Sequence, residues 1–342
     1  MGRRAAAFLV GLLVVIVLGV GAVVIKLPYV LLTPGPTQNT LGSAGGQPFI
    51  QVKGHQTYAA DGHLSLVTFY AFGNGTSDIN VFAILQAWLS PGDGVISQGQ
   101  ADAEGLMTPP QDAVSPAQLR QQMIAAALRE LKIPFREAVV VASTEPGSPA
   151  AAVLRAGDVL TAVDGRPVTS IGGAGQQIDG RGPGQLVKIT VDRGGMTRTF
   201  RLLTKPDPEG HAEIGVTLIG SFRFPLTVRV SNDACNGGCG LMFALALIDK
   251  LAPLNLTGGA FIAGTGTLDD AGNVGAVTNI NVLMAGLRGR GATIFLTPAA
   301  DCQQALQAAP TGMRLVKVST LHGAVQALEA LRAGRPVPGC TR

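Results

Sequence analysis

The chain has 342 residues, a formal net charge of +4 and a mean hydropathy of +0.33. This length is enough for about two or three compact domains. The basic residues are scattered, and no segment has the phosphate-binding pattern G-x-x-x-x-G-K-S/T. We therefore expect no nucleic-acid partner, no NTP-driven activity and no cofactor. A metal site is not expected either, because His55, His63 and His211 lack the spacing of metal ligands.

The N-terminal segment from Ala5 to Ile25 contains no charged or polar side chain. A helix of about 20 such residues crosses the hydrocarbon core of a bilayer. Because Arg3 and Arg4 precede the segment, the positive-inside rule predicts a cytoplasmic N-terminus. The sequence thus predicts a single-pass anchor in the cell membrane, with the bulk of the chain extracytoplasmic. A cleaved signal peptide is the alternative, although its apolar region is normally shorter.

All four cysteines lie after this segment, at Cys235, Cys239, Cys302 and Cys340. An even number of cysteines in an oxidising compartment favours disulfides, and four cysteines allow three connectivities. We favour a Cys302–Cys340 bridge, which ties down the C-terminal tail, together with a local Cys235–Cys239 bridge. Free, buried thiols are the alternative.

The patterns before residue 136 predict, in chain order, an extended segment, short strands, a helix, a loop and a second helix, at Leu27–Thr40, Phe49–Phe69, Asp78–Leu89, Ala101–Ala113 and from Ser115. Three prolines keep the first of these segments out of a helix. The last helix begins with the capping box Ser115-Pro116-Ala117-Gln118, which has proline at the first helical position.

The next segment contains a β-branched strand, Ala138–Ser143, and two strands around Gly194-Gly195, which is a hairpin signal. Three strings in it, Glu145–Ala151, Arg155–Leu160 and Val163–Gly165, resemble a PDZ domain of the kind attached to bacterial envelope proteases.

This resemblance implies a groove that accepts an extended peptide as an added strand. We expect the peptide on the first strand of the domain, at Ala138, Val139, Val140 and Val141. The residues before that strand, Pro134–Glu137, lack a glycine-rich carboxylate-binding loop. Internal segments are therefore expected as ligands in preference to a free C-terminus. The alternative is a PDZ fold that acts only as a spacer.

Residues 221–342 alternate strands and helices. The predicted strands are Leu226–Val230, Gly259–Gly264, Ala292–Leu296 and Arg314–Val318, and the predicted helices are Leu241–Leu251, Ile280–Arg288, Asp301–Ala308 and Leu321–Leu331. The strings Gly240–Ala246, Leu256–Leu268, Gly272–Gly275 and Gly291–Pro298 resemble the Lon-type peptidase domain. With the anchor and the PDZ-like segment ahead of them, the chain is similar to the membrane-anchored PDZ–Lon proteases of Gram-positive bacteria.

The predicted fold class is α+β, with four parts along the chain. They are a tail and transmembrane helix (1–26), a family-specific N-terminal region of strands and helices (27–135), a β-rich PDZ domain (136–220) and a Lon-like peptidase domain (221–342).

The proteases of this family use a serine nucleophile and a lysine that takes its proton. Aligning the strings places Gly238 at the serine position and Leu283 at the lysine position, and neither side chain supports that chemistry. Cys239 is a potential thiolate near a helix N-terminus. It is displaced by one residue and needs a base, for which His322 is the histidine of this domain.

The resemblance therefore implies a pseudoprotease, which binds polypeptide segments or an active paralogous protease. The alternative is an active ATP-independent endopeptidase with Cys239 as its nucleophile. A purely structural membrane scaffold is a third hypothesis. The family also implies a homo-oligomer.

Overall fold

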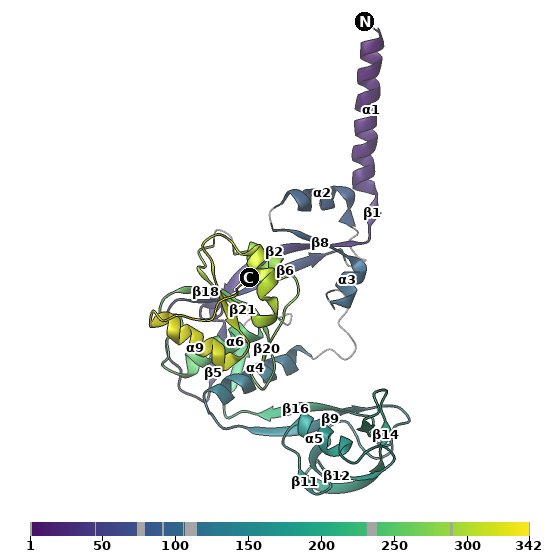
Figure 1. The fold of residues 1–342 in the computed structure, drawn as a ribbon, viewed down its shortest axis with the longest axis vertical. Helices are drawn as coiled ribbons and strands as arrows, with labels where there is room; N and C mark the ends of the chain where they lie inside the picture. The colour runs from purple at the N-terminus through teal and green to yellow at the C-terminus, as the bar shows by residue number, and fades with distance from the viewer. Residues whose placement is uncertain are drawn as a thin grey trace. The chain divides into compact units, whose positions relative to one another are not determined.

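The computed structural model describes residues 2–44, 46–73, 79–90, 92–104, 106, 115–230, 238–287 and 290–341. The chain divides into two compact units (Figure 1). Unit 1 combines residues 1–132 with residues 226–342, and unit 2 is the segment 133–225 between them.

Unit 1 is built from eight helices and fourteen strands within its described residues. The helices are α1 (Gly2–Val24), α2 (Val81–Leu89), α3 (Gln98–Ala103), α4 (Pro116–Glu130), α6 (Gly240–Leu251), α7 (Ile280–Ala285), α8 (Cys302–Ala308) and α9 (Leu321–Arg332), with a 3-10 turn at Ala299–Asp301. The strands are β1 (Lys26–Leu27), β2 (Tyr29–Asn39), β3 (Ser43–Ala44), β4 (Gln47–Pro48), β5 (Ile50–Lys53), β6 (His63–Phe72), β7 (Ile79–Asn80), β8 (Gly94–Ser97), β17 (Thr227–Val230), β18 (Phe261–Gly264), β19 (Thr267–Leu268), β20 (Val274–Gly275), β21 (Ile294–Pro298) and β22 (Arg314–Val318).

The main sheet of unit 1 has the strand order β22-β21-β18-β6-β2-β8. Strands β22, β21, β18 and β6 run parallel, and β2 runs antiparallel to both of its neighbours. Strand β6 comes from the N-terminal part of the chain, and its neighbour β18 comes from the C-terminal part. The structure thus differs from the expectation of separate domains at 27–135 and 221–342, because one sheet includes strands from both segments.

Helices cover both faces of this sheet. Gly264 of β18 faces α6, since a Cβ atom on it would lie 2.7 Å from the sulfur of Met242. The preceding residue, Ala263, belongs to the apolar cluster that contains Leu283 and Met284 of α7. Successive strand residues point to opposite faces. Helices α6 and α7 therefore lie on opposite sides of the sheet.

The predicted helix after Ser115 is present as α4. The Ser115 hydroxyl accepts the N–H of Gln118 at 3.3 Å, and proline occupies the first turn. The predicted loop at 101–113 is wrong in its first residues, because helix α3 extends to Ala103. Ser97 caps that helix and Ala101 is fully buried. The rest of that predicted loop, from residue 107, lies outside the described residues.

Helix α1 is the part of unit 1 that matches the predicted anchor. Its segment Ala7–Val24 is long and apolar enough to cross a membrane, and none of it is buried against the rest of the chain. Length and composition are the evidence for this, and a signal sequence would have the same properties.

The C-terminal tail is joined to α8 by a disulfide between Cys302 and Cys340, so that predicted pairing is confirmed. The tail also forms a β-bridge between Val316 and Gly339. Cys239 is disulfide-bonded as well. Cys235, its predicted partner, lies outside the described residues.

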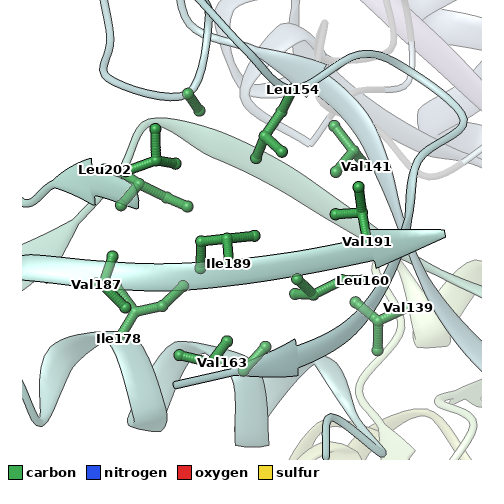
Figure 2. Packing of buried hydrophobic residues seen from close by; sticks show 13 residues of the cluster. Val139, Val141, Leu154, Leu160, Val163, Ile178, Val187, Ile189, Val191 and Leu202 are labelled. Carbon is green, nitrogen blue, oxygen red and sulfur yellow. The ribbon is translucent and has the colours of Figure 1, made fainter. Parts of the chain in front are cut away.

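Unit 2 contains one helix, α5 (Ile171–Asp179), and strands β9 (Arg136–Thr144), β10 (Val159–Val163), β11 (Arg166–Pro167), β12 (Leu186–Arg193), β13 (Met196–Leu203), β14 (Lys205–Pro206), β15 (Ala212–Glu213) and β16 (Val216–Arg223). The main sheet has the order β13-β12-β10-β9-β16. Its core is a cluster of branched aliphatic side chains (Figure 2). Val187, Ile189 and Val191 alternate along β12 and are fully buried, as expected for one face of a half-buried sheet.

Candidate functional site

In unit 1, Gly238, which the family resemblance predicts at the position of the catalytic serine, lies just before α6. The Gly238 carbonyl accepts the Thr265 hydroxyl and the Gly266 N–H, both at 2.9 Å. A Cβ atom on Gly238 would lie 3.2 Å from Thr265 Oγ1 and 3.4 Å from a methyl group of Val277. A side chain here would thus project between a hydroxyl and an apolar group, and it would need small movements of both.

The position predicted to replace the catalytic lysine, Leu283, is a core residue with 4 % of its surface exposed. It belongs to an apolar cluster with Val67 and Phe295, and Val277 packs against the same cluster. Val277 therefore lies near both predicted positions. One of them has no side chain and the other has a buried apolar side chain, so neither carries a titratable group.

A buried carboxylate that sequence reasoning missed lies next to these positions. Asp301 is 5 % exposed, and its Oδ2 accepts the N–H of Val277 at 2.9 Å. Burial raises the pKa of the Asp301 carboxyl. The sequence does not indicate this burial, because Asp301 stands at the start of the predicted helix Asp301–Ala308, where aspartate normally acts as a cap.

The proposed substitute nucleophile, Cys239, is 4 % exposed and takes part in a disulfide. A disulfide sulfur lacks the thiolate that nucleophilic attack needs. The proposed base, His322, is exposed; its Nδ1 lies 2.9 Å from the Glu130 carboxylate and its Nε2 lies 2.9 Å from the Gln326 amide. These contacts argue against a cysteine–histidine pair in the oxidised protein.

The sequence predicts no metal site at His211, and the structure places two carboxylates beside this side chain. Atoms of Asp207, Glu209 and His211 lie within 4.8 Å of one another in the turn between β14 and β15. Asp207 Oδ1 accepts the N–H groups of Glu209 and His211 at 2.9 and 2.8 Å. These hydrogen bonds within the turn account for the cluster.

In unit 2, the predicted peptide-binding strand is an interior strand. All four predicted residues pair with β16, in the register Ala138 with Ser221 through Val141 with Leu218. Val139 and Val140 also pair with β10 on the other side. An added strand needs an open edge. The assignment of Ala138, Val139, Val140 and Val141 as the docking strand must therefore be corrected, because both edges of β9 are occupied.

Strand β16 lies at the end of the sheet beside β9, and its main-chain geometry is that of an open edge. In an antiparallel pair, residues alternate between bonding across the pair and pointing their N–H and C=O groups away from it. Glu145 donates to the Gly215 carbonyl at 3.0 Å, which makes Val216 a residue of the second kind. Val141 bonds to Gly157 and Asp158 on the β10 side, so its partner Leu218 is also of the second kind.

The start of β16 is fixed by a turn of the resembling string Glu145–Ala151. Gly215 has φ of +69°, and its carbonyl accepts the Ser148 hydroxyl at 3.1 Å. The Ile214 carbonyl accepts the N–H of Ala150 at 3.0 Å. A Cβ atom on Gly215 would overlap the Cβ of Ser148. Glycine is therefore required here both by backbone conformation and by close approach.

Two carboxylates and one ammonium group surround this end of the strand. Lys205 Nζ lies 3.0 Å from Glu145 and 3.1 Å from Glu213. Hydrogen bonds to Glu145 and then Glu213 raise the pKa of the Lys205 ammonium. The net charge of these three groups is negative, which disfavours a third carboxylate at this place.

A family model described as PDZ domain matches residues 116–204. The chain contains a PDZ domain. Three similar solved structures are the PDZ domain of an SdrC-like protein from Listeria monocytogenes (33% identity, covering 23% of this chain and 85% of that one, TM-score 0.23), the PDZ domain of an SdrC-like protein from Listeria innocua (29%, 24%, 92% and 0.23) and a protein from Geobacillus thermodenitrificans (32%, 23%, 94% and 0.22). No curated protein matches the chain.

The matched range leaves the open edge of the PDZ domain unassigned. It begins at α4, which the structure places in unit 1, and it ends before β16. A sequence signal for this strand exists after the last matched strand, where Ile214-Gly215-Val216 is followed by further apolar residues. The expected PDZ segment 136–220 included most of it without giving it a role.

Within the PDZ domain, the resembling string Arg155–Leu160 is held by a buried ion pair. Asp158, 1 % exposed, accepts from Arg193 Nε at 2.6 Å, from Arg193 Nη2 at 2.7 Å and from the Arg155 N–H at 2.9 Å. Arg193 also donates to the Val153 carbonyl at 2.7 Å. The hydrogen bonds from Arg193 lower the pKa of Asp158 against the opposing effect of burial. This pair links the turn before β10 to the end of β12.

Proposed function

We propose that this protein is a membrane-anchored polypeptide-binding protein, and that its PDZ domain receives an extended segment along β16. The observation that carries the proposal is the edge position of β16, whose Val216 and Leu218 direct their N–H and C=O groups away from β9. Helix α5 contacts β16, and Val216 and Leu218 pack in part against the PDZ core. A peptide added here would form main-chain hydrogen bonds and would have α5 as a neighbour.

The ligand we propose is an internal segment and not a free C-terminus. A peptide that pairs antiparallel with β16 would place its C-terminal carboxylate beside the start of β16, which is where Glu145 and Glu213 lie. Lys205 neutralises one of these charges and is engaged by both carboxylates. Capture of a terminal carboxylate would need an uncommitted donor or cation at this point.

The test uses the isotopically labelled PDZ unit, residues 133–225, and peptides selected from a random library with blocked ends. We expect bound peptides to shift the amide resonances of Val216, Leu218 and α5. Affinity should be equal for free and amidated C-termini. Peptides that instead shift the opposite edge, β13, or that bind only with a free carboxylate, would contradict the proposal.

A pair of proline variants tests whether the outward-facing N–H groups of β16 bind the peptide. Proline lacks an N–H and is tolerated on strand edges where that group faces outward. Leu218→Pro should weaken peptide binding while leaving the domain folded, because the Leu218 N–H points away from β9. Ile219→Pro, at the next position, should disrupt the pairing of β16 with β9.

For unit 1 we propose a pseudoprotease role, in which the Lon-like segment binds clients or an active paralogous protease without cleaving them. The proposal rests on the sequence resemblance and is supported by Gly238 and Leu283, since neither offers a nucleophile or a base. The disulfide at Cys239 weighs against the alternative, an endopeptidase that uses this cysteine.

Cleavage of unfolded casein by the full chain tests this role. The natural protein should be inactive. Activity that disappears in Cys239→Ala would refute the proposal in favour of a cysteine enzyme. If a Gly238→Ser, Leu283→Lys variant cleaves casein, only the reactive groups were lost. If that variant folds and stays inactive, the peptidase cleft has changed as well.

The anchor we propose is α1, with Arg3 and Arg4 on the cytoplasmic side and the two units outside. The Cys302–Cys340 disulfide agrees with an oxidising compartment. Mass measurement of the protein extracted from cell membranes would decide between an intact N-terminus and removal of residues 1–25. A ring or another homo-oligomer remains a prediction of the family resemblance.

A further inference from the structure

Helix α2 (Val81–Leu89) has an exposed face that is almost wholly apolar. Phe82, Leu85, Trp88 and Leu89 are exposed, with Trp88 at 73 % and Leu89 at 86 %. At about 100° per residue, these four side chains occupy an arc of roughly 120° of the helix. The opposite side holds the buried residues Ile84 and Ala87. The face is thus too apolar for a helix that meets only water.

This helix is held next to the end of the proposed membrane span. Helix α1 ends at Val24, and β1 pairs with β7 in the register Lys26 with Asn80 and Leu27 with Ile79. Asn80 is also the N-cap of α2, and its side chain accepts the N–H of Ala83 at 2.8 Å. Paired strands lie about 4.8 Å apart. The first turn of α2 is therefore fixed at the level where the chain leaves α1.

The two helices contact each other, and α2 lies crosswise beside the end of α1 (Figure 1). A helix in this position has the orientation of an interfacial helix, whose axis lies in the membrane plane. Further exposed aromatic side chains come from the adjoining strands, namely Tyr29 of β2 and Tyr70 and Phe72 of β6. Trp and Tyr are the residues enriched at membrane–water interfaces.

We propose that the exposed face of α2 binds the lipid interface, so that unit 1 lies against the bilayer from which α1 emerges. The inference rests on the proposed anchoring by α1 and goes beyond it, because a span alone leaves the following unit free to move. The bilayer is the occupant that fits, since α2 contacts the span itself and the apolar side chains include tryptophan. Burial of the face in the headgroup region removes its apolar surface from water.

The sole tryptophan of the chain is Trp88, so its fluorescence reports on this face alone. The experiment places the full chain in neutral phosphatidylcholine vesicles whose acyl chains carry bromine atoms at defined depths. We expect a blue-shifted emission and a loss of Trp88 intensity that is greatest for bromines about 5–10 Å below the headgroups. Acrylamide in the water should quench weakly.

A variant with Phe82→Gln and Leu89→Gln should lose most of the quenching by bromine and gain quenching by acrylamide. The matched control is Leu186→Gln with Leu203→Gln, two exposed leucines of the PDZ domain, which should leave Trp88 unchanged. Flotation of the same vesicles separates the two proposals. Protein that floats while Trp88 responds only to acrylamide overturns the lipid contact and leaves the anchor standing.

Two other results also overturn the inference. If the protein does not float with the vesicles, both the proposed anchor and the proposed lipid contact are refuted. Protein that floats while Trp88 is quenched by neither agent has α2 covered by protein, such as a second copy of the chain, and crosslinking would then identify the contact.

Discussion

Replacing Gly215 with alanine tests the link between the turn of the PDZ domain and the open edge of β16. Gly215 has φ of +69°, where an L side chain is strained by about 1–2 kcal/mol. The substitution also lowers the entropy of the unfolded chain, which offsets about 0.4–1 kcal/mol of that strain. Conformation alone therefore costs about 1 kcal/mol.

The larger effect comes from the neighbour. The added methyl group would overlap the Cβ of Ser148, which is attached to a buried turn and cannot rotate away. Overpacking of this kind costs about 1–3 kcal/mol. Because the Gly215 carbonyl holds both Ser148 and Glu145, relief of the overlap would shift the start of β16. We expect a total loss of about 3 kcal/mol and weaker peptide binding.

Urea unfolding of residues 133–225, followed by circular dichroism, measures this loss. Gly184→Ala is the matched control, because Gly184 has φ of +73° and an added Cβ atom there would meet no other atom within 4 Å. That variant should lose only about 1 kcal/mol. Equal losses in the two variants would refute the role of the Ser148 contact. An unchanged peptide affinity in Gly215→Ala would show that the turn does not control peptide binding at the edge of β16.

Three further predictions concern buried charges and the tail. Asp158→Asn should destabilise the PDZ domain by about 1.5–3 kcal/mol in urea unfolding, because the hydrogen bonds from Arg193 lose their charged acceptor. The stabilisation from the lowered Asp158 pKa should be present above the unfolded-state pKa, near 4, and lost as the pH falls through the folded-state pKa. Asp301 has a raised pKa, so its ionisation should lower the stability of unit 1 as the pH rises, and Asp301→Asn should flatten that dependence in thermal melts. Cys302→Ser with Cys340→Ser should cost about 2–4 kcal/mol, since the bond closes a loop with a sequence separation of 38, and a smaller loss would mean that the tail is held by its strand contacts.

Local signals in the sequence predicted local structure well. The capping box at Ser115 marked the start of α4, and Gly194-Gly195 marked the turn between β12 and β13. The predicted strand Arg314–Val318 is present with the same bounds, and the predicted helix Leu241–Leu251 differs by one residue at its start. These features depend on hydrogen bonds and side-chain periodicity within a few residues, which the sequence displays directly.

The sequence did not show which strand of the PDZ domain lies at the edge of its sheet. Strand β9 contains the β-branched run Val139–Val141, and that run reflects burial between two strands and not availability to a ligand. Its partner β16 comes from the far end of the PDZ unit, and the same kind of long-range pairing joins β6 to β18 in unit 1.

The sequence by itself determined the apolar N-terminal helix, the PDZ strings and the absence of a serine and a lysine at Gly238 and Leu283, and it favoured the Cys302–Cys340 pairing among several alternatives. Only the tertiary structure decided that β16 is the edge strand, that unit 1 is assembled from both ends of the chain and that Asp301 is buried. The physical reason is that edges, shared sheets and burial are set by contacts between residues distant in sequence, and local periodicity carries no record of which distant segment supplies the partner.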